Sequence, residues 1–522
     1  MSCESQRWRQ VSSPSCPFHS SLTQIPATYS RPYGSPIHIL DNDSVLNIFQ
    51  HYRPIILEED ENDDDRILEG GEWGRERWWY KLAHVCRRWR YLILASASHL
   101  RLHLVCTYGT PVADMLAHSP PLPLVIDHVD DDHDITTEQE EGIVLALQLR
   151  DRVRRLRLQM PIPNLERLIT TLGDEFPVLD YLYVAVLTKD KTNLVLPQTF
   201  QAPQLRHLVL DNVVCSIGSP LLTPAMGLLT LSLLNIQPSA YFSPNDLLQR
   251  LSLMPQLETL GIVFHSPVSN RHIERQLLNT PIVTRVTLPS LQWFGFKGAS
   301  AYLEALLPRM ITPILEKLQI LFFNQLTYPV PHLLQFINTA ETLTFRRARI
   351  AFDEEGVSIR VYPHQGAKMY TLYVEVGCKP IDWQVASAAQ VFNALRTAFL
   401  TVDCLTLEYN GSFIPLEWRH EVDRRPWREL LTSFSNVKIL RVGVGDDFVR
   451  QLSRSLQVED GELPLELLPE LKELSYSAID DDDAAFTAFI DTRQNSGRPV
   501  TLIRRGTSPT ESSFSAFFSE EG

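Results

Sequence analysis

A short pattern, apolar-x-x-apolar-x-apolar, returns along most of the chain. The last two apolar positions of each copy flank one polar or small residue, which predicts a strand with one buried face. The copies begin 23 to 35 residues apart, and this spacing predicts a stack of similar units. Their first residues are Val153, Leu179, Leu205, Leu228, Leu257, Leu291, Leu315, Ala340, Met369, Val402, Val437 and Leu471.

Between the copies lie segments with helix-like apolar spacing: 165–177, 245–255, 301–310, 331–340, 390–400 and 427–436. One strand and one helix cannot cover their own apolar faces, so neighbouring units must stack. Stacking places the strands in a parallel sheet with the helices on one side. We therefore predict an α/β fold in which residues 106–504 form a curved solenoid, with 110–134 as its first, irregular unit. A large α/β protein of another topology is the alternative.

Two further patterns with helical spacing stand near the N-terminus. In LDNDSVLNIFQHY, residues 40–52, Asp41 or Asp43 can cap the helix because a short side-chain oxygen accepts an unpaired backbone N–H. The sequence WWYKLAHVCRRWRYLILA, residues 78–95, places one continuous apolar stripe on a second helix. The apolar positions of the two helices are Val45, Leu46, Ile48, Phe49 and Tyr52, and Leu82, Val85, Cys86, Trp89 and Ile93.

The segment between these helices, 53–77, contains the run EEDENDDD, whose carboxylates repel one another and predict a solvated loop. A loop of this length adds little closure entropy, so the two helices can still pack together. Residues 1–34 and 505–522 have no apolar period, and we expect a disordered leader and a disordered tail.

Charge and cysteine content narrow the function classes. A net charge of −14 repels a phosphate backbone, so we expect no nucleic-acid partner. The basic, aromatic stretch around Trp89 could stack bases, but Trp89 belongs to the apolar stripe, which favours a place in a core. Seven scattered cysteines without a CxxC pair fit neither a zinc site nor a secreted disulfide framework. Without an apolar run of membrane-spanning length or a signal-peptide core, a cytoplasmic or nuclear protein without membrane attachment is expected.

Catalytic spacings are missing from the sequence. It contains no GxSxG elbow, no HExxH pair and no GxxxxGK[ST] phosphate loop. The acidic runs at 130–134 and 480–483 offer metal-type ligands, but both are better interpreted as solvated turns. We therefore expect no enzyme activity, no metal and no cofactor. A hydrolase or nuclease would need a convergent polar pocket.

The two N-terminal helices resemble the F-box motif. The first has the family's leucine, acid, two apolar residues and Ile-Phe pair at Leu40, Asp43, Val45, Leu46, Ile48 and Phe49. The second carries the family's L-x-x-V-C-[RK]-x-W-[RK] signature at Leu82, Val85, Cys86, Arg87, Trp89 and Arg90. The chain departs from the family at Asp41, where proline is usual, and in the insertion 53–77. The copies resemble irregular leucine-rich repeats, and the combination resembles the large F-box families of mushroom-forming fungi.

This resemblance implies a substrate-recruiting subunit of a cullin-type (SCF) ubiquitin ligase. The F-box, residues 35–105, would bind a Skp-type adaptor and through it a cullin, while the solenoid would bind a protein target. The alternative is a non-catalytic interaction scaffold whose F-box does not engage a ligase. The expected adaptor-binding residues are Leu40, Val45, Leu46, Ile48, Phe49, Leu82, Val85, Cys86 and Trp89. On the concave face of the solenoid we expect the target to meet Arg157, Tyr183, Asp211, Lys297, Arg346, Tyr373, Glu375, Glu408 and Arg441.

Overall fold

The computed structural model describes residues 40–52, 78–129, 135–170, 173, 175–187, 194–223, 225–267, 283–325, 327–378, 381–410, 424–443, 446–457, 467–477 and 486–505. The chain divides into two compact units, residues 1–53 and 54–522. The predicted leader, the acidic insertion and most of the predicted tail lie outside the described residues.

The first unit contains helix α1, Asn42–Tyr52, which begins at the predicted cap. The Asp41 carboxylate accepts hydrogen bonds from the Ser44 backbone N–H at 2.7 Å and from the Ser44 hydroxyl at 3.1 Å. These bonds stabilise the charged form and lower the pKa of Asp41. Along α1, Val45 and Phe49 are buried, whereas Ile48 and Tyr52 are exposed.

The second unit begins with two short helices where the sequence predicts one. Helix α2 runs from Trp78 to Ala83 and α3 from Arg87 to Ala95, with a turn between them. The prediction of one continuous helix over 78–95 is therefore wrong. Cys86 takes an extended backbone conformation and caps α3, since its sulfur accepts the Trp89 N–H. Because the cap interrupts the helix, the predicted apolar stripe does not lie on one face.

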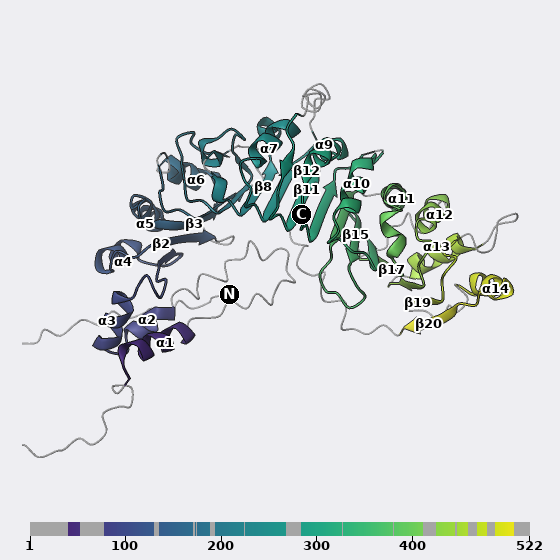
Figure 1. Ribbon diagram of the computed structural model, residues 1–522, viewed down its shortest axis with the longest axis horizontal. Helices are drawn as coiled ribbons and strands as arrows, with labels where there is room; N and C mark the ends of the chain where they lie inside the picture. The colour runs from purple at the N-terminus through teal and green to yellow at the C-terminus, as the bar shows by residue number, and fades with distance from the viewer. Residues whose placement is uncertain are drawn as a thin grey trace, which may run out of the picture. The chain divides into compact units, whose positions relative to one another are not determined.

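Within the described ranges, most of the second unit is built on a single sheet of 16 strands. In spatial order these are β1 (Leu104–Thr107), β2 (Leu124–Val129), β3 (Val153–Met160), β4 (Tyr181–Val186), β6 (His207–Asp211), β8 (Thr230–Ile236), β9 (Thr259–Phe264), β11 (Trp293–Gly298), β13 (Lys317–Phe322), β16 (Leu372–Gly377), β15 (Gly356–Tyr362), β14 (Arg347–Phe352), β17 (Cys404–Tyr409), β18 (Ile439–Val442), β19 (Glu473–Ser477) and β20 (Thr501–Arg505). Two small sheets pair β5 (Leu194–Val195) with β7 (Val213–Val214), and β10 (Val286–Thr287) with β12 (Met310–Ile311). Within this unit the large sheet follows an arc (Figure 1).

The sheet confirms the predicted α/β repeat architecture with two local corrections. Neighbouring strands are parallel except at β15, which is antiparallel to both β14 and β16. The copy beginning at Ala340 forms no strand; β14 starts at Arg347, where Ala348, Ile350 and Phe352 are the buried alternating positions. The small side chain of Ala348 weakens the apolar pattern at the true strand.

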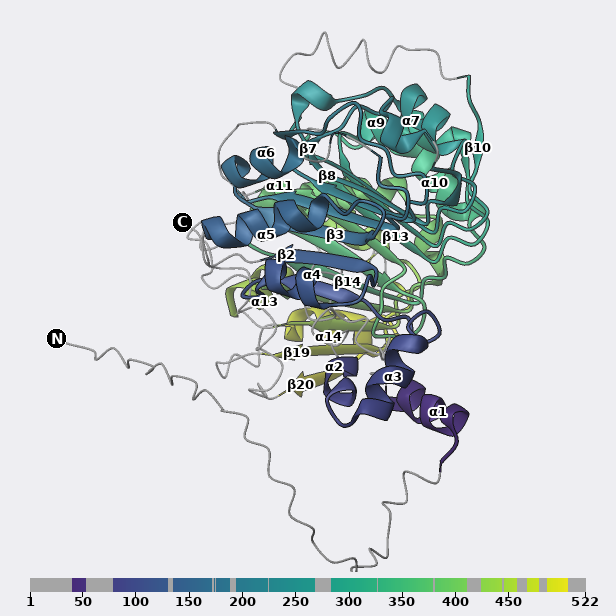
Figure 2. The same ribbon diagram turned by 90° about the vertical axis from the view of Figure 1, so that its left-hand side faces the viewer.

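Helices cover one face of this sheet (Figures 1 and 2). They are α4 (Val112–His118), α5 (Thr137–Leu147), α6 (Ile162–Ile169), α7 (Pro244–Leu251), α9 (Ser300–Leu306), α10 (Pro331–Thr339), α11 (Ile381–Ala394), α12 (Arg424–Thr432), α13 (Asp446–Leu456) and α14 (Thr487–Asn495). Each of the six predicted helical segments overlaps one of them. Between helices and sheet lies the core, into which alternate strand residues such as Leu156 and Leu158 point.

His128 lies in the core and should make the stability of the chain depend on pH. Burial lowers the pKa of His128 on β2 from 6.5 to about 4, because the charged imidazolium loses its hydration. The folded state therefore gains stability above pH 6.5 that is lost as the pH falls toward 4, by up to about 3 kcal/mol. We expect His128→Leu to flatten this loss. Urea unfolding of both proteins at pH 7 and pH 4.5 measures it.

Both proteins are measured because Asp127, the residue before His128, titrates in the opposite sense. Its raised pKa removes stability as the pH rises through about 6, and this contribution is common to both proteins. An equal loss of stability on acidification in the two proteins would contradict a buried, neutral His128.

Candidate protein-binding face

The face of the sheet opposite the helices, here called the open face, holds the side chains that alternate with the core positions. Parallel register brings residues of successive strands side by side: Asp127 lies beside Arg157, and Arg157 beside Tyr183. Nearly all the residues predicted for target binding lie on this face. Arg346 does not, because it precedes β14, and its neighbour Arg347 occupies the first open-face position of that strand.

At its first strands the open face is covered by its own side chains and offers little accessible surface. Arg157 is 3 % exposed and Tyr183 is 2 % exposed, so neither is accessible for the target contact that the sequence predicts. The Arg157 guanidinium lies 5.2 Å from the Tyr183 ring centroid, and its Nη1 lies 3.9 Å from an Asp127 carboxylate oxygen. Burial raises the pKa of Asp127 to about 6, and the Arg157 charge opposes this rise. Long side chains in adjacent strands cover one another here and form a local core.

Further along the sheet, side-chain amides form hydrogen bonds between neighbouring strand ends at the edge of the open face. The Asn235 side chain donates to the Asp211 carboxylate at 2.7 Å, and burial raises the pKa of Asp211. Gln237 donates to the Asn212 side chain at 2.6 Å. Asn212 and Asn235 have φ of 54° and 49°, in the left-handed region that asparagine tolerates better than most residues. The Asp211 carboxylate is therefore engaged in a hydrogen bond within the protein.

The middle of the open face carries a tryptophan that lies flat on the sheet. A Cβ atom added at Gly295 would come within 2.9 Å of Cζ2 and Cζ3 of Trp293, and one at Gly261 within 3.4 Å of Cζ3. The two glycines, on β11 and β9, therefore leave the space that the indole occupies. Sequence reasoning missed Trp293, although glycine recurs at the same position of the copies LETLGI and LQWFGF. Lys297, predicted for target binding, lies on the same strand and is half-buried.

Aromatic and cationic side chains alternate from β13 to β15. The Lys317 ammonium lies 4.4 Å from the Tyr370 ring centroid, and Arg360 lies 5.5 Å from that of Tyr373. The Tyr373 hydroxyl donates to the Glu375 carboxylate. Burial, followed by the charge of Glu375, raises the pKa of Tyr373 well above its usual range.

The arginines of β14 and β18 complete this face. Arg347 lies 3.9 Å from the Tyr362 ring centroid, and its two terminal nitrogens donate to the backbone carbonyls of Gln365 and Ala367 at 3.0 Å. Arg349 forms an ion pair with the Glu408 carboxylate. Arg441 stands two strands away, with Thr406 between it and Arg349 in the register.

The predicted adaptor-binding residues divide by exposure. In the first unit, Val45 and Phe49 are buried, Leu46 and Leu40, which precedes α1, are half-buried, and Ile48 is exposed. In the second unit, Leu82 is buried and Cys86 and Trp89 are half-buried, whereas Val85 in the turn is 59 % exposed. Buried members of the set can only shape the helices, so direct contact with a partner would fall to the exposed ones.

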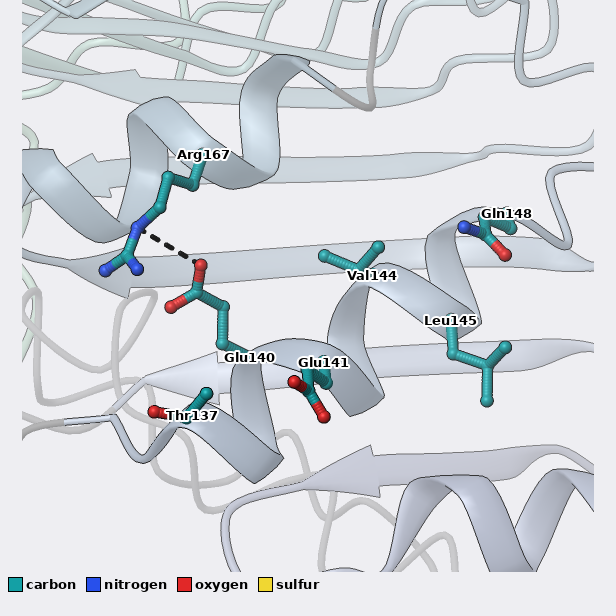
Figure 3. A pocket seen from close by; sticks show the side chains of 7 residues that line it. All are labelled: Thr137, Glu140, Glu141, Val144, Leu145, Gln148 and Arg167. Carbon is teal, nitrogen blue, oxygen red and sulfur yellow. Dashed lines mark ion pairs between the residues drawn. The ribbon is translucent and has the colours of Figure 1, made fainter.

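A shallow pocket of about 330 Å³ lies on the helical side between α5 and α6 (Figure 3). Arg167 and Glu140, which line it, form an ion pair at 3.2 Å, and Val144 and Leu145 contribute apolar lining. The polar side chains shown there do not converge on a common point, as a catalytic site requires.

Within the described ranges, no group of three or more histidine, cysteine or acidic side chains is arranged to hold a metal ion. The acidic runs at 130–134 and 480–483, considered above as metal-type ligands, lie outside those ranges. No helix in the described part of the chain is long and apolar enough to cross a membrane.

No protein-family model matches the chain, and no curated protein matches it. Among solved structures, the chain is similar to TLR13 in the TLR13–ssRNA13 complex, at 12% identity over 78% of this chain with a TM-score of 0.30. The chain spans 50% of that protein's length. It is also similar to the leucine-rich repeat-containing protein LegL7 from Legionella pneumophila, at 11% identity over 77% of this chain and 99% of that one, with a TM-score of 0.24. The sheet topology alone therefore defines the class, an α/β repeat solenoid with one open sheet face.

Proposed function

We propose that this chain is the substrate-recruiting F-box subunit of a cullin-type ubiquitin ligase. Its N-terminal helices would bind a Skp-type adaptor, and the open face of its solenoid would bind a protein target. The target would be presented to a separate ubiquitin-transferring enzyme, so that high local concentration replaces catalysis by this chain.

The observation that carries the proposal is the position of Val85. It belongs to the Val-Cys-Arg-x-Trp string on which the F-box resemblance rests, and it stands in the turn between α2 and α3 with 59 % of its surface exposed. An apolar side chain left this open, next to a cap that fixes the turn, is suited to contact with another protein. Ile48 and Tyr52 offer further exposed apolar surface on α1.

The open face supports the second half of the proposal. From β9 to β18 its charged and aromatic side chains are half-buried, except for the buried Tyr362, so their positions are fixed while part of most of them remains accessible. Side chains held in this way lose little conformational entropy when a partner binds.

Replacing Val85 with aspartate should abolish adaptor binding. A carboxylate in an apolar interface loses its hydration without gaining a partner, which should weaken the complex by about a hundredfold or more. Calorimetric titration of the full chain with a purified Skp-type adaptor measures the effect. Val195→Asp is the matched control, because Val195 on β5 is 55 % exposed and lies outside the F-box-like helices.

Equal affinities of the Val85→Asp and Val195→Asp variants would remove Val85 from the interface. If the unaltered chain does not bind, deleting residues 53–77 tests whether the acidic insertion blocks the site. Failure of both proteins to bind would favour the interaction scaffold over the ligase subunit.

A further inference from the structure

The open face from β11 to β18 is positively charged although the chain as a whole is acidic. It carries six cationic side chains: Lys297, Lys317, Arg347, Arg349, Arg360 and Arg441. Only Glu375 and Glu408 oppose them on these strands. A local excess of four positive charges, on a chain whose net charge is −14, creates a confined field that attracts acidic groups.

Arg360 and Arg441 are among the cations of this face that have no carboxylate partner within the described ranges. Glu408 is engaged by Arg349, and Glu375 accepts the Tyr373 hydroxyl. Arg360 and Arg441 form no ion pair with any described residue, and the Nε atom of each is buried without a hydrogen-bond acceptor. A half-buried guanidinium binds an incoming carboxylate more strongly than a fully solvated one, because water screens the pair less.

The Trp293 indole provides an apolar contact on the same face. One side of the ring rests on Gly295 and Gly261, and the side chain is half-buried. A ring fixed in this orientation can stack against a flat apolar group of a partner, with a gain beyond simple burial of area.

The spacing of Trp293, Arg360 and Arg441 indicates the length of a ligand that could contact all three. Three strand steps separate Trp293 on β11 from Arg360 on β15, and three more separate Arg360 from Arg441 on β18. At about 4.8 Å per step each interval is about 14 Å, which an extended chain covers in about four residues.

We propose that this face binds an extended acidic peptide in which an aromatic residue and two acidic residues stand four positions apart. The aromatic side chain stacks on Trp293, and the two carboxylates pair with Arg360 and Arg441. This inference rests on the proposed target-binding role of the solenoid and names the chemistry of its target. An acidic peptide is favoured over single-stranded nucleic acid because Glu375 and Glu408 interrupt the patch, and the remaining charge of the chain repels a long polyanion.

The test uses the full chain and a fluorescently labelled nine-residue peptide with phenylalanine at its first position and glutamate at its fifth and ninth. Fluorescence anisotropy should show saturable binding that weakens about tenfold when both glutamates are glutamine. Arg360→Gln and Arg441→Gln should each weaken binding by a similar factor. The matched control is Arg167→Gln on α6, whose side chain is 62% exposed on the helical side, and it should leave binding unchanged.

Trp293 is tested by a double comparison. Trp293→Ala should weaken binding of the phenylalanine peptide but not of the same peptide with alanine at its first position, a pattern that a merely misfolded variant would not give.

Equal binding of the glutamate and glutamine peptides, or equal effects of Arg441→Gln and Arg167→Gln, would overturn the proposal. Tighter binding of a twenty-nucleotide single-stranded RNA would assign the face to nucleic acid instead. Tighter peptide binding by a chain that ends at Arg505 would assign it to residues 506–522. Since adaptor titration of the same preparation is independent of this face, loss of peptide binding alone leaves the ligase proposal standing.

Discussion

Replacing Trp427 with alanine is expected to lower the free energy of unfolding by about 3–5 kcal/mol. Trp427 on α12 is 1 % exposed, and its ring centroid lies 5.4 Å from that of Phe352 on β14 and 5.6 Å from that of Phe448 on α13. The indole therefore joins a helix, a strand and the next helix of the stack. Alanine would leave a cavity among them that rigid backbone cannot close.

Urea unfolding followed by circular dichroism measures the loss, and hydrogen exchange locates it. Because each repeat contacts only its neighbours, exchange should accelerate in α12, α13 and β17 and remain unchanged in β3. Trp383→Ala on α11 is the matched control, since Trp383 is 54 % exposed and should cost less than about 1 kcal/mol. Similar losses in the two variants would contradict the packing described for Trp427.

Replacing Arg493 with methionine is expected to cost about 2–4 kcal/mol and to loosen the last repeat. Arg493 on α14 is fully buried, and its guanidinium donates to the backbone carbonyls of Leu467, Leu468, Pro469 and Leu471 at 3.1–3.4 Å. Leu468 has a φ of 49°, a left-handed conformation that leucine adopts at a cost. Methionine keeps the apolar stem but leaves the converging carbonyls without a donor.

In the Arg493→Met protein we expect faster hydrogen exchange in α14 and β20 and no change in β4. Arg498→Met serves as the control: Arg498 also donates to the Pro469 carbonyl, at 2.9 Å, but its side chain is 49% exposed and water can replace it. Unaltered exchange at β20 in the Arg493→Met protein would show that these bonds do not hold the last repeat.

The strands of the solenoid could be predicted because they bury one face, which fixes a period of two. This alternation did not predict β14, because the small side chain of Ala348 weakens the apolar pattern there. It also could not show that β15 runs antiparallel, because alternation is the same in both strand directions. The break between α2 and α3 was missed for another reason. Apolar spacing is preserved across the Cys86 cap even though the backbone is not helical there.

The sequence predicted which residues lie on the open face better than it predicted how exposed their side chains are. Alternation places Arg157, Tyr183 and Arg441 on the correct side of the sheet, but it does not show how neighbouring side chains cover one another. Arg157 and Tyr183 are therefore buried, whereas Arg441 is half-buried and without an ion pair among the described residues. Trp293 could have been found from the two glycines beneath it, because glycine inside a strand indicates a close approach of another group.

As proposed above, this chain would connect a target to a cullin through an adaptor. The most direct test is to mix the full chain with a purified Skp-type adaptor and a cullin at micromolar concentration and to measure the mass of the complex. We expect an assembly with one copy of each protein, which does not form when the adaptor is omitted or when the Val85→Asp chain is used. A chain that remains free beside a preformed adaptor–cullin pair would contradict it.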